Sequence, residues 1–229
     1  SSVDESLFEN APTEWVRWRG YCDITPKWQC DPRWTFMGVW SDSIDEKRDA
    51  AGILSRASYF GDQELLFYFS FKDVLGGRNN RRYVRRDLNF AFACPGEDLG
   101  GGYCVLLGGF DNRGTQLLRR GVVVAETDKF RLPPYKGRVE DVHWVWYVLR
   151  VQRRGGLIRV FVDDREVLSW TDPEPLPGGH VGVWTLGNGM ILGRTRFSAE
   201  RRGPVLAGFD RGGPARPAAA GWRSFASDR

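Results

Sequence analysis

Hydrophobic and polar side chains alternate along most of the chain, and this period of two restricts its fold more than any other feature. Residues on one face of an extended strand are two apart, whereas a helix repeats every 3.6 residues. No stretch of the sequence carries the helical repeat over three turns. Short alternating runs are separated by glycine-rich turns instead, and the Gly-Asn-Gly segment at 187–189 is a strong hairpin signal.

This pattern predicts about a dozen strands with turns at regular spacing. Such a series is typical of an all-β fold, a two-sheet antiparallel β-sandwich or jelly roll. The predicted strands cover residues 15–24, 34–40, 57–60, 64–72, 87–94, 103–110, 115–119, 121–127, 143–152, 157–162, 165–170, 181–185 and 191–197.

The chain of 229 residues suits one large all-β domain with a short appendage. We predict the sandwich over residues 1–200. Residues 201–229 are basic and rich in glycine, proline and alanine, which predicts an extended C-terminal arm or a linker. The longest apolar run, at 144–149, is far shorter than the ~20 residues that cross a bilayer, so we expect no transmembrane segment.

The net charge is +4, and only five of the 33 basic residues are lysine. Two explanations fit this excess of arginine. One is a biased genomic composition. The other is a functional role, because guanidinium groups bind carboxylates and phosphates bidentately. The densest cluster runs from Arg78 to Arg86 and predicts an anionic docking surface. No recognition helix or RNA-binding motif accompanies it, so we expect no nucleic acid partner.

The chain has four cysteines, spaced C-x7-C and C-x9-C, and neither spacing matches a structural zinc site. Two local pairs suggest the disulfides Cys22–Cys30 and Cys94–Cys104, although four cysteines allow three connectivities. Disulfides imply an extracytoplasmic location: the periplasm, the cell surface or the medium. The alternative is four reduced, buried thiols in a cytosolic protein.

Several segments resemble the concanavalin A-like lectin/glucanase superfamily, in particular its laminin G-like and bacterial sugar-hydrolase-like domains. The resemblance rests on GGLIRVFVDD, DPEPLPGGHVGVWT, GGYCVLLGGF and the opening WVRWRGYCDIT, and it covers roughly residues 8–198. It implies a two-sheet β-sandwich. It says little about activity, because this fold is shared by lectins, hydrolases, lyases and adhesion modules.

Glycosidases of the resembling fold carry two or three acidic residues on one strand, spaced E-x-D-x-E. Here Glu126 and Asp128 form the only E-x-D pair, and the second glutamate is missing. The two histidines, His143 and His180, lack an accompanying G-x-S-x-G motif. We therefore expect no catalytic residue and no cofactor.

Calcium is an alternative, because many sandwich domains of the superfamily bind it in loops. Asp111-Asn112 and Asp163-Asp164 have suitable oxygens. Asp and Asn in tight turns more often bond to their own backbone, so we predict no metal site.

A ligand site is predicted in two loops. Residues 34–40 are apolar on both faces and are expected in the core, whereas Trp28 lies in a loop with Asp31 and Arg33, where it stacks on a ligand or folds back onto the sheet. The resemblance places ligand contacts at the loop formed by Asp111, Asn112 and Arg113, with Arg119 on the next strand.

We therefore expect a non-catalytic, exported module that recognises carbohydrate or a protein partner through its loops and arginine-rich surface. One alternative is a structural accessory subunit of a larger complex, including a membrane-associated one, docked through the 78–86 cluster and the C-terminal arm. A glycoside hydrolase or lyase is the third.

Overall fold

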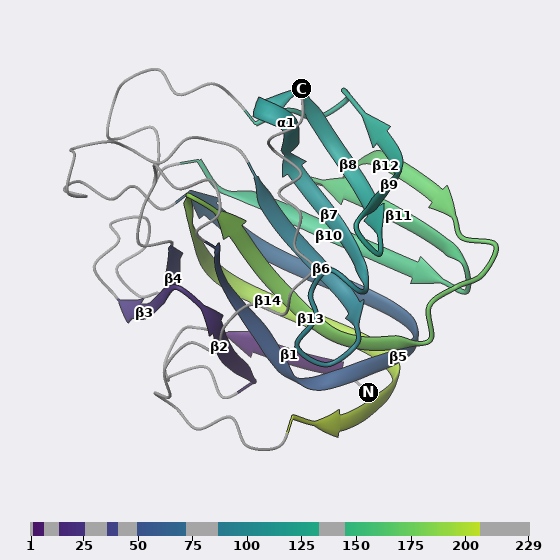
Figure 1. Ribbon diagram of the computed structural model, residues 1–229, viewed down its shortest axis with the longest axis horizontal. Coiled ribbons are helices and arrows are strands. Elements are labelled where there is room, and N and C mark those ends of the chain that lie inside the picture. Colours follow the sequence, from purple (N-terminus) through teal and green to yellow (C-terminus); the bar gives the residue numbers. More distant parts are fainter. Residues whose placement is uncertain are drawn as a thin grey trace.

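The computed structural model confirms an all-β chain and describes residues 2–6, 14–25, 36–40, 50–71, 87–132 and 145–206 (Figure 1). One short helix, α1 (Gly109–Asn112), accompanies the strands in these residues. The strands are β1 (Ser2–Ser6), β2 (Trp15–Arg19), β3 (Tyr21–Thr25), β4 (Phe36–Trp40), β5 (Ala50–Phe71), β6 (Leu88–Cys94), β7 (Tyr103–Gly108), β8 (Gly114–Arg119), β9 (Val122–Thr127), β10 (Tyr147–Arg154), β11 (Leu157–Val162), β12 (Arg165–Thr171), β13 (Gly178–Leu186) and β14 (Gly189–Val205).

β5 is 22 residues long and takes part in both layers of the sandwich. Its first half, up to Phe60, pairs with β13 and β2, and its second half, from Gln63, pairs with β10. β14 follows β5 around the bend, from Met190 opposite Phe71 to Val205 opposite Ala57. Figure 1 shows β5 turning back on itself between the two layers.

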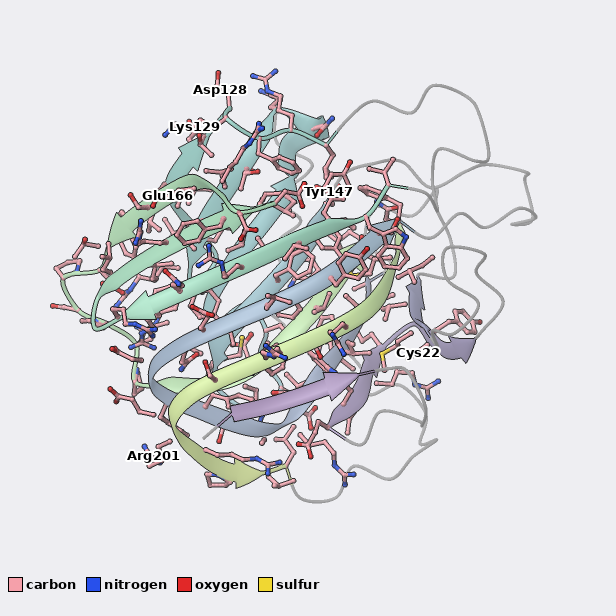
Figure 2. The ribbon with its side chains drawn as sticks, turned by 180° about the vertical axis from the view of Figure 1, so that it is seen from behind. Cys22, Asp128, Lys129, Tyr147, Glu166 and Arg201 are labelled. Atoms are coloured by element: carbon pink, nitrogen blue, oxygen red, sulfur yellow. The ribbon has the colours of Figure 1, made fainter. Side chains whose placement is uncertain are left out.

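The two halves of β5 therefore define two antiparallel sheets. Sheet I contains β12, β11, β10, the second half of β5 and β14, with β1, β4 and β3 beside β14. Sheet II contains β2, the first half of β5, β13, β6, β7, β8 and β9. Figure 2 views the molecule from the side opposite to Figure 1.

Aromatic side chains fill the space between the sheets. Phe67 on β5 of sheet I lies 5.0 Å, centroid to centroid, from Phe90 on β6 of sheet II. Phe67 also lies 5.4 Å from the ring of Phe197, and all three rings are buried. Each such ring removes a large apolar area from water, about 25 cal/mol per Å², so this contact between layers is a main source of stability.

A second apolar cluster covers the outer face of sheet II. This explains why β6 and β7 are buried on both faces. Leu99, from the loop between these strands, packs directly on Gly182, and Trp184 lies beside Gly52. The members of this cluster are Leu54, Ala91, Cys94, Leu99, Cys104, Leu106, Leu118 and Trp184.

The tryptophan-rich stretch at 34–40 contributes to the sandwich through β4, which pairs with β3 and β14. Met37 and Val39 are buried, as expected of a core strand, whereas Trp34 lies outside the described residues.

β14 continues to Val205, so the sandwich extends beyond the predicted boundary at residue 200. The rest of the predicted arm, 207–229, and the 78–86 cluster also lie outside the described residues. Among the described residues, no helix has the length and apolar character needed to cross a bilayer.

The predicted Cys94–Cys104 disulfide was wrong: both residues are thiols. Cys104 pairs with Ala91 across β6 and β7, so the two cysteines are not opposite one another. The Cys94 thiol donates to the Leu99 carbonyl oxygen, and the Cys104 thiol to the Asn89 side-chain oxygen, each at 3.6 Å. The Cys22–Cys30 pair cannot be placed, because Cys30 lies outside the described residues.

We predict that Cys94 and Cys104 resist alkylation in the native protein. Burial raises the pKa of Cys104 to about 12 and that of Cys94 well above its usual range, so neither forms the reactive thiolate near neutral pH. Peptide mass mapping after alkylation at pH 8 should find both residues modified only when the protein is unfolded without reductant. A disulfide-linked peptide pair containing residues 94 and 104 would contradict this assignment.

We also predict that Gly52→Val strongly destabilises the fold, although valine favours strands. A Cβ at Gly52 would lie 2.7 Å from the Trp184 Cβ and 2.8 Å from the Val183 carbonyl oxygen. Overpacking of this kind costs about 3 kcal/mol or more of unfolding free energy, measured by urea denaturation. The control is Arg17→Val on the neighbouring strand, where the exposed position should change stability by about 0.5 kcal/mol or less. Equal effects of the two variants would exclude this packing argument.

Candidate functional site

A pocket of about 360 Å³ opens where strand ends from both halves of the chain meet. β5, β13, β14 and the loop between β6 and β7 contribute its walls. Its lining residues are Ser58, Phe60, Cys94, Pro95, Gly96, Gly178, Gly179, His180, Pro204, Val205 and Leu206.

Two glycines bring the beginning of β13 close to its neighbours at this pocket. Gly178 has φ 131° and Gly179 has φ 154°, in the region that favours glycine. A Cβ at Gly178 would collide with the Tyr59 carbonyl oxygen, and one at Gly179 with the Cys94 carbonyl oxygen. The Gly-Gly pair therefore leaves backbone, rather than side chains, on this side of the pocket.

Phe60 supplies the aromatic wall of the pocket, and its ring is partly exposed. The ring lies beneath the guanidinium of Arg201, whose Cζ is 4.2 Å from the ring centroid. Gly203 leaves room for the ring edge, since a Cβ there would collide with Phe60 Cε2. The ring is therefore held between a cation and the backbone of β14.

The titratable residues that line the pocket, Cys94 and His180, are neutral near pH 7. Burial lowers the pKa of His180, although its Nδ1 lies 3.0 Å from the Ser55 carbonyl oxygen. Cys94 remains a thiol because burial raises its pKa. Thus the described lining contains an aromatic ring, prolines, the exposed backbone of Gly96 and a neutral imidazole, and none of its side chains is acidic.

Beyond the pocket, a row of paired residues crosses the outer face of sheet II. The row runs from Trp184 through Asn89 and Leu106 to Gln116 and Glu126, each opposite the next on the adjacent strand. Asn89 and Gln116 are only 2% and 3% exposed. Glu126 is exposed and is the single carboxylate of this row, so the row brings no pair of acids together.

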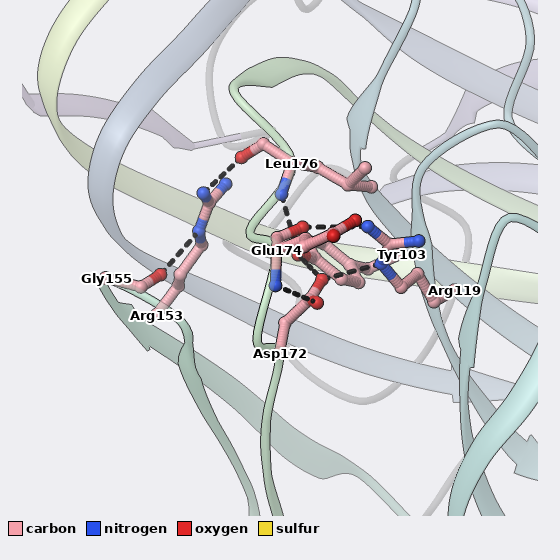
Figure 3. A network of polar contacts seen from close by, with 7 residues as sticks. All are labelled: Tyr103, Arg119, Arg153, Gly155, Asp172, Glu174 and Leu176. Carbon is pink, nitrogen blue, oxygen red and sulfur yellow. Dashed lines mark hydrogen bonds and ion pairs between the residues drawn. The ribbon is translucent and has the colours of Figure 1, made fainter.

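A polar network joins the loop after β12 to sheet II (Figure 3). The Asp172 carboxylate accepts hydrogen bonds from the Tyr103 hydroxyl at 2.5 Å and from Arg119 Nε at 2.6 Å. It also accepts one from the Glu174 N–H at 2.9 Å, while the Tyr103 hydroxyl accepts from the Leu176 N–H. Arg153, on β10 of sheet I, donates to the Leu176 carbonyl oxygen.

Two charged groups of this network, Arg119 and Asp172, pair with each other. Burial alone would raise the pKa of Asp172, but the hydrogen bonds from Tyr103, the Glu174 N–H and Arg119 outweigh burial and lower it below 3.8. The carboxylate is therefore ionised and bonded from several sides, as a group that fixes a loop is. We assign the network to holding the 172–176 loop in place.

Two of the predicted site residues make structural contacts. Arg119 belongs to the Asp172 network and also donates to the Glu174 carbonyl oxygen at 2.7 Å. Asn112 donates to the Leu132 carbonyl oxygen at 2.6 Å and accepts from the Leu132 N–H. The exposed Arg113 follows α1, and its N–H donates to the Gly109 carbonyl oxygen.

Asp111 lies within α1, and its side chain is outside the described part of the structure. Trp28, Asp31 and Arg33 are outside it altogether, so a ligand role for these residues stays a prediction. Of the predicted ligand residues that the structure describes, Asn112, Arg113 and Arg119, none lines the pocket, whereas Cys94 of the predicted disulfide does.

The pocket residues gave a weak signal in the sequence. Phe60 precedes a Gly-Asp turn, where the end of one predicted strand and the start of the next suggested only a hairpin. At the alternative calcium loops, Asp163 accepts a hydrogen bond from the Val148 N–H at 2.9 Å, and Arg150 Nη2 lies 3.5 Å from Asp164. No cluster of three metal-binding side chains occurs in the part of the chain that the structure covers.

We predict that Asp172→Asn lowers the free energy of unfolding at pH 7 by roughly 2–4 kcal/mol, because it removes the charge from a buried network. Since the folded-state pKa is below 3.8, this contribution is present in full above that pH and disappears as the pH falls through the lower value. Urea denaturation of both proteins between pH 7 and pH 2.5 should show the difference shrinking.

The matched control is Glu166→Gln, which removes an exposed ion pair with Arg159 and should cost less than about 1 kcal/mol. A constant difference between wild type and Asp172→Asn down to pH 2.5 would refute the ionised network.

No known protein-family model and no curated protein sequence matches the chain. Solved structures do. The carbohydrate binding module CBM66 from Bacillus subtilis is 16% identical, with a TM-score of 0.53 over 81% of this chain and 96% of that one. The Bacillus licheniformis beta-glucanase is 14% identical, with a TM-score of 0.55 over 88% and 99%.

The exoplasmic/lumenal domain of VIP36, in a Ca²⁺- and mannose-bound form, is 11% identical, with a TM-score of 0.56 over 86% of this chain and 88% of that one. At these identities, the similarity establishes the fold alone. These structures confirm the resemblance inferred from the sequence: the chain has the concanavalin A-like β-sandwich fold.

Proposed function

We propose that this protein is a non-catalytic carbohydrate-binding module whose ligand occupies the Phe60 pocket. The observation that carries the proposal is a partly exposed aromatic ring that forms the wall of a mostly apolar pocket, with the exposed backbone of Gly96 beside it. The C–H face of a sugar ring packs against an aromatic ring, while its hydroxyls bond to backbone N–H and C=O groups. A pocket of about 360 Å³ is within the range that small ligands occupy.

Chemically, the pocket suits binding better than hydrolysis. Glycosidases need two carboxyl groups across the scissile bond, about 5–10 Å apart. The described lining offers no acid, Glu126 stands alone in its row, and Asp172 is committed to the polar network. A glycoside hydrolase or lyase acting in this pocket would need acids from outside its described lining.

The structural neighbours give further support, because they include a carbohydrate binding module and a lumenal domain bound to mannose. A module of this kind meets polysaccharide outside the cytoplasm, so we place the protein in the periplasm, on the cell surface or in the medium. The Cys94 and Cys104 thiols lend no support to this location. No surface among the described residues supports binding of a protein partner.

We predict that Phe60→Ala and Phe60→Leu both reduce glycan binding at least tenfold, because neither keeps an aromatic face for the sugar. A glycan array should identify ligands, and calorimetry should measure the loss of affinity. Phe60→Leu keeps apolar volume, which limits loss of stability. Tyr21→Ala is the control, since Tyr21 is an exposed aromatic residue that does not line the pocket. Wild-type affinity in both Phe60 variants would place the site elsewhere, and failure of the wild type to bind any glycan would exclude the proposed function.

A further inference from the structure

The guanidinium of Arg201 lies over the Phe60 ring, which lines the pocket, and has no described counter-ion. It contacts the Phe60 ring and forms no ion pair with a described carboxylate. Its neighbour Arg202 differs, because Arg202 Nη2 lies 2.6 Å from Glu14 Oε2. The adjacent Glu200 carboxylate lies against Gly61 instead. Figure 2 shows Arg201 projecting from β14 at the margin of the molecule.

Two contacts restrict the position of Arg201, although this arginine is exposed. β14 pairs Arg201 directly with Phe60, so the residue that carries the charge and the residue that forms the pocket wall face each other on adjacent strands. Contact with the ring restricts the guanidinium, and its N–H donors make no hydrogen bond to a described residue. A group that binds in the pocket against Phe60 therefore meets the donors of Arg201 at its edge.

The charge of the surroundings favours an anion at this position. No acidic side chain lines the described pocket, and His180 is neutral, so nothing in the lining competes for Arg201. The whole chain carries a net charge of +4. A carboxylate matches the planar fork of arginine and accepts two parallel hydrogen bonds, which a neutral hydroxymethyl group does not.

We propose that the pocket selects acidic sugars, with a uronic acid ring packed on Phe60 and its carboxylate bonded to Arg201. This inference rests on the proposed carbohydrate-binding function and specifies its ligand class. The sugar ring lies against the aromatic wall, its hydroxyls meet the exposed backbone at Gly96, and its carboxylate points to Arg201.

The test compares two oligomers that differ only in charge, an oligogalacturonate and its fully methyl-esterified form, by calorimetry at low ionic strength. Wild type should bind the acid more tightly, and added salt should weaken only that interaction. Arg201→Gln should reduce affinity for the acid roughly tenfold to a hundredfold, the effect of losing a charged hydrogen-bonded pair, and leave the ester within about twofold. Arg201→Lys keeps the charge but not the fork and should recover part of the loss.

Arg194→Gln is the matched control, because Arg194 is exposed on the same strand and pairs with Tyr68, away from the pocket. It should bind both oligomers like wild type. Unchanged affinity of Arg201→Gln for the acid, together with loss of binding in Phe60→Ala, would overturn the selection of acidic sugars and leave the carbohydrate site in place.

Failure of wild type to bind oligogalacturonate overturns the inference as well, even where neutral glycans bind at Phe60. A sulfated oligosaccharide of the same length separates the two kinds of anion. Tighter binding of the sulfated chain than of the uronate would overturn the assignment to a carboxylate.

Discussion

The fold depends on one strand that belongs to two sheets. β5 supplies hydrogen bonds to both layers and turns between Phe60 and Gln63, so the position of each layer is fixed relative to the other by covalent backbone. The Phe67–Phe90 contact then closes the space between the layers. Because β14 bends along with β5, it pairs with residues on both sides of the turn, Ala199 with Gln63 and Arg201 with Phe60, and the pocket forms beside it where β14 ends.

Burial of both faces of sheet II determines where a ligand site is available. The middle of its outer face is closed by apolar side chains such as Leu99 and Trp184, and the buried Asn89 amide donates to the Asp87 carbonyl oxygen. The ends of the strands are different, because Gly178 and Gly179 place no side chain there. The candidate site therefore lies at an end of the sheet, where an aromatic ring, a guanidinium and peptide groups come from segments far apart in sequence.

Much of the fold could be predicted from local pattern. The Arg-Arg-Gly-Gly turn at 153–156 separated β10 from β11, and the Gly-Asn-Gly turn marked the β13–β14 connection, because both signals are carried by adjacent residues. The site could not be predicted in this way, since Phe60 and Arg201 meet only through pairing across about 140 residues. The predicted ligand residues Asn112 and Arg119 looked available in sequence, but their partners, Leu132 and Asp172, are likewise set by tertiary structure. The Cys94–Cys104 error has the same origin: loop spacing was suitable, but strand register offset the thiols.

The double role of β5 also has a consequence for synthesis of the chain. Its partners β10, β13 and β14 all follow it by many residues, so contacts of high sequence separation must form before either layer is complete. As the polypeptide leaves the ribosome, only β2 is available to pair with this long apolar segment, and its other edges stay open until β10, β13 and β14 emerge. A nascent chain of this kind is exposed to premature association and is a natural client for chaperones that shield unpaired strands.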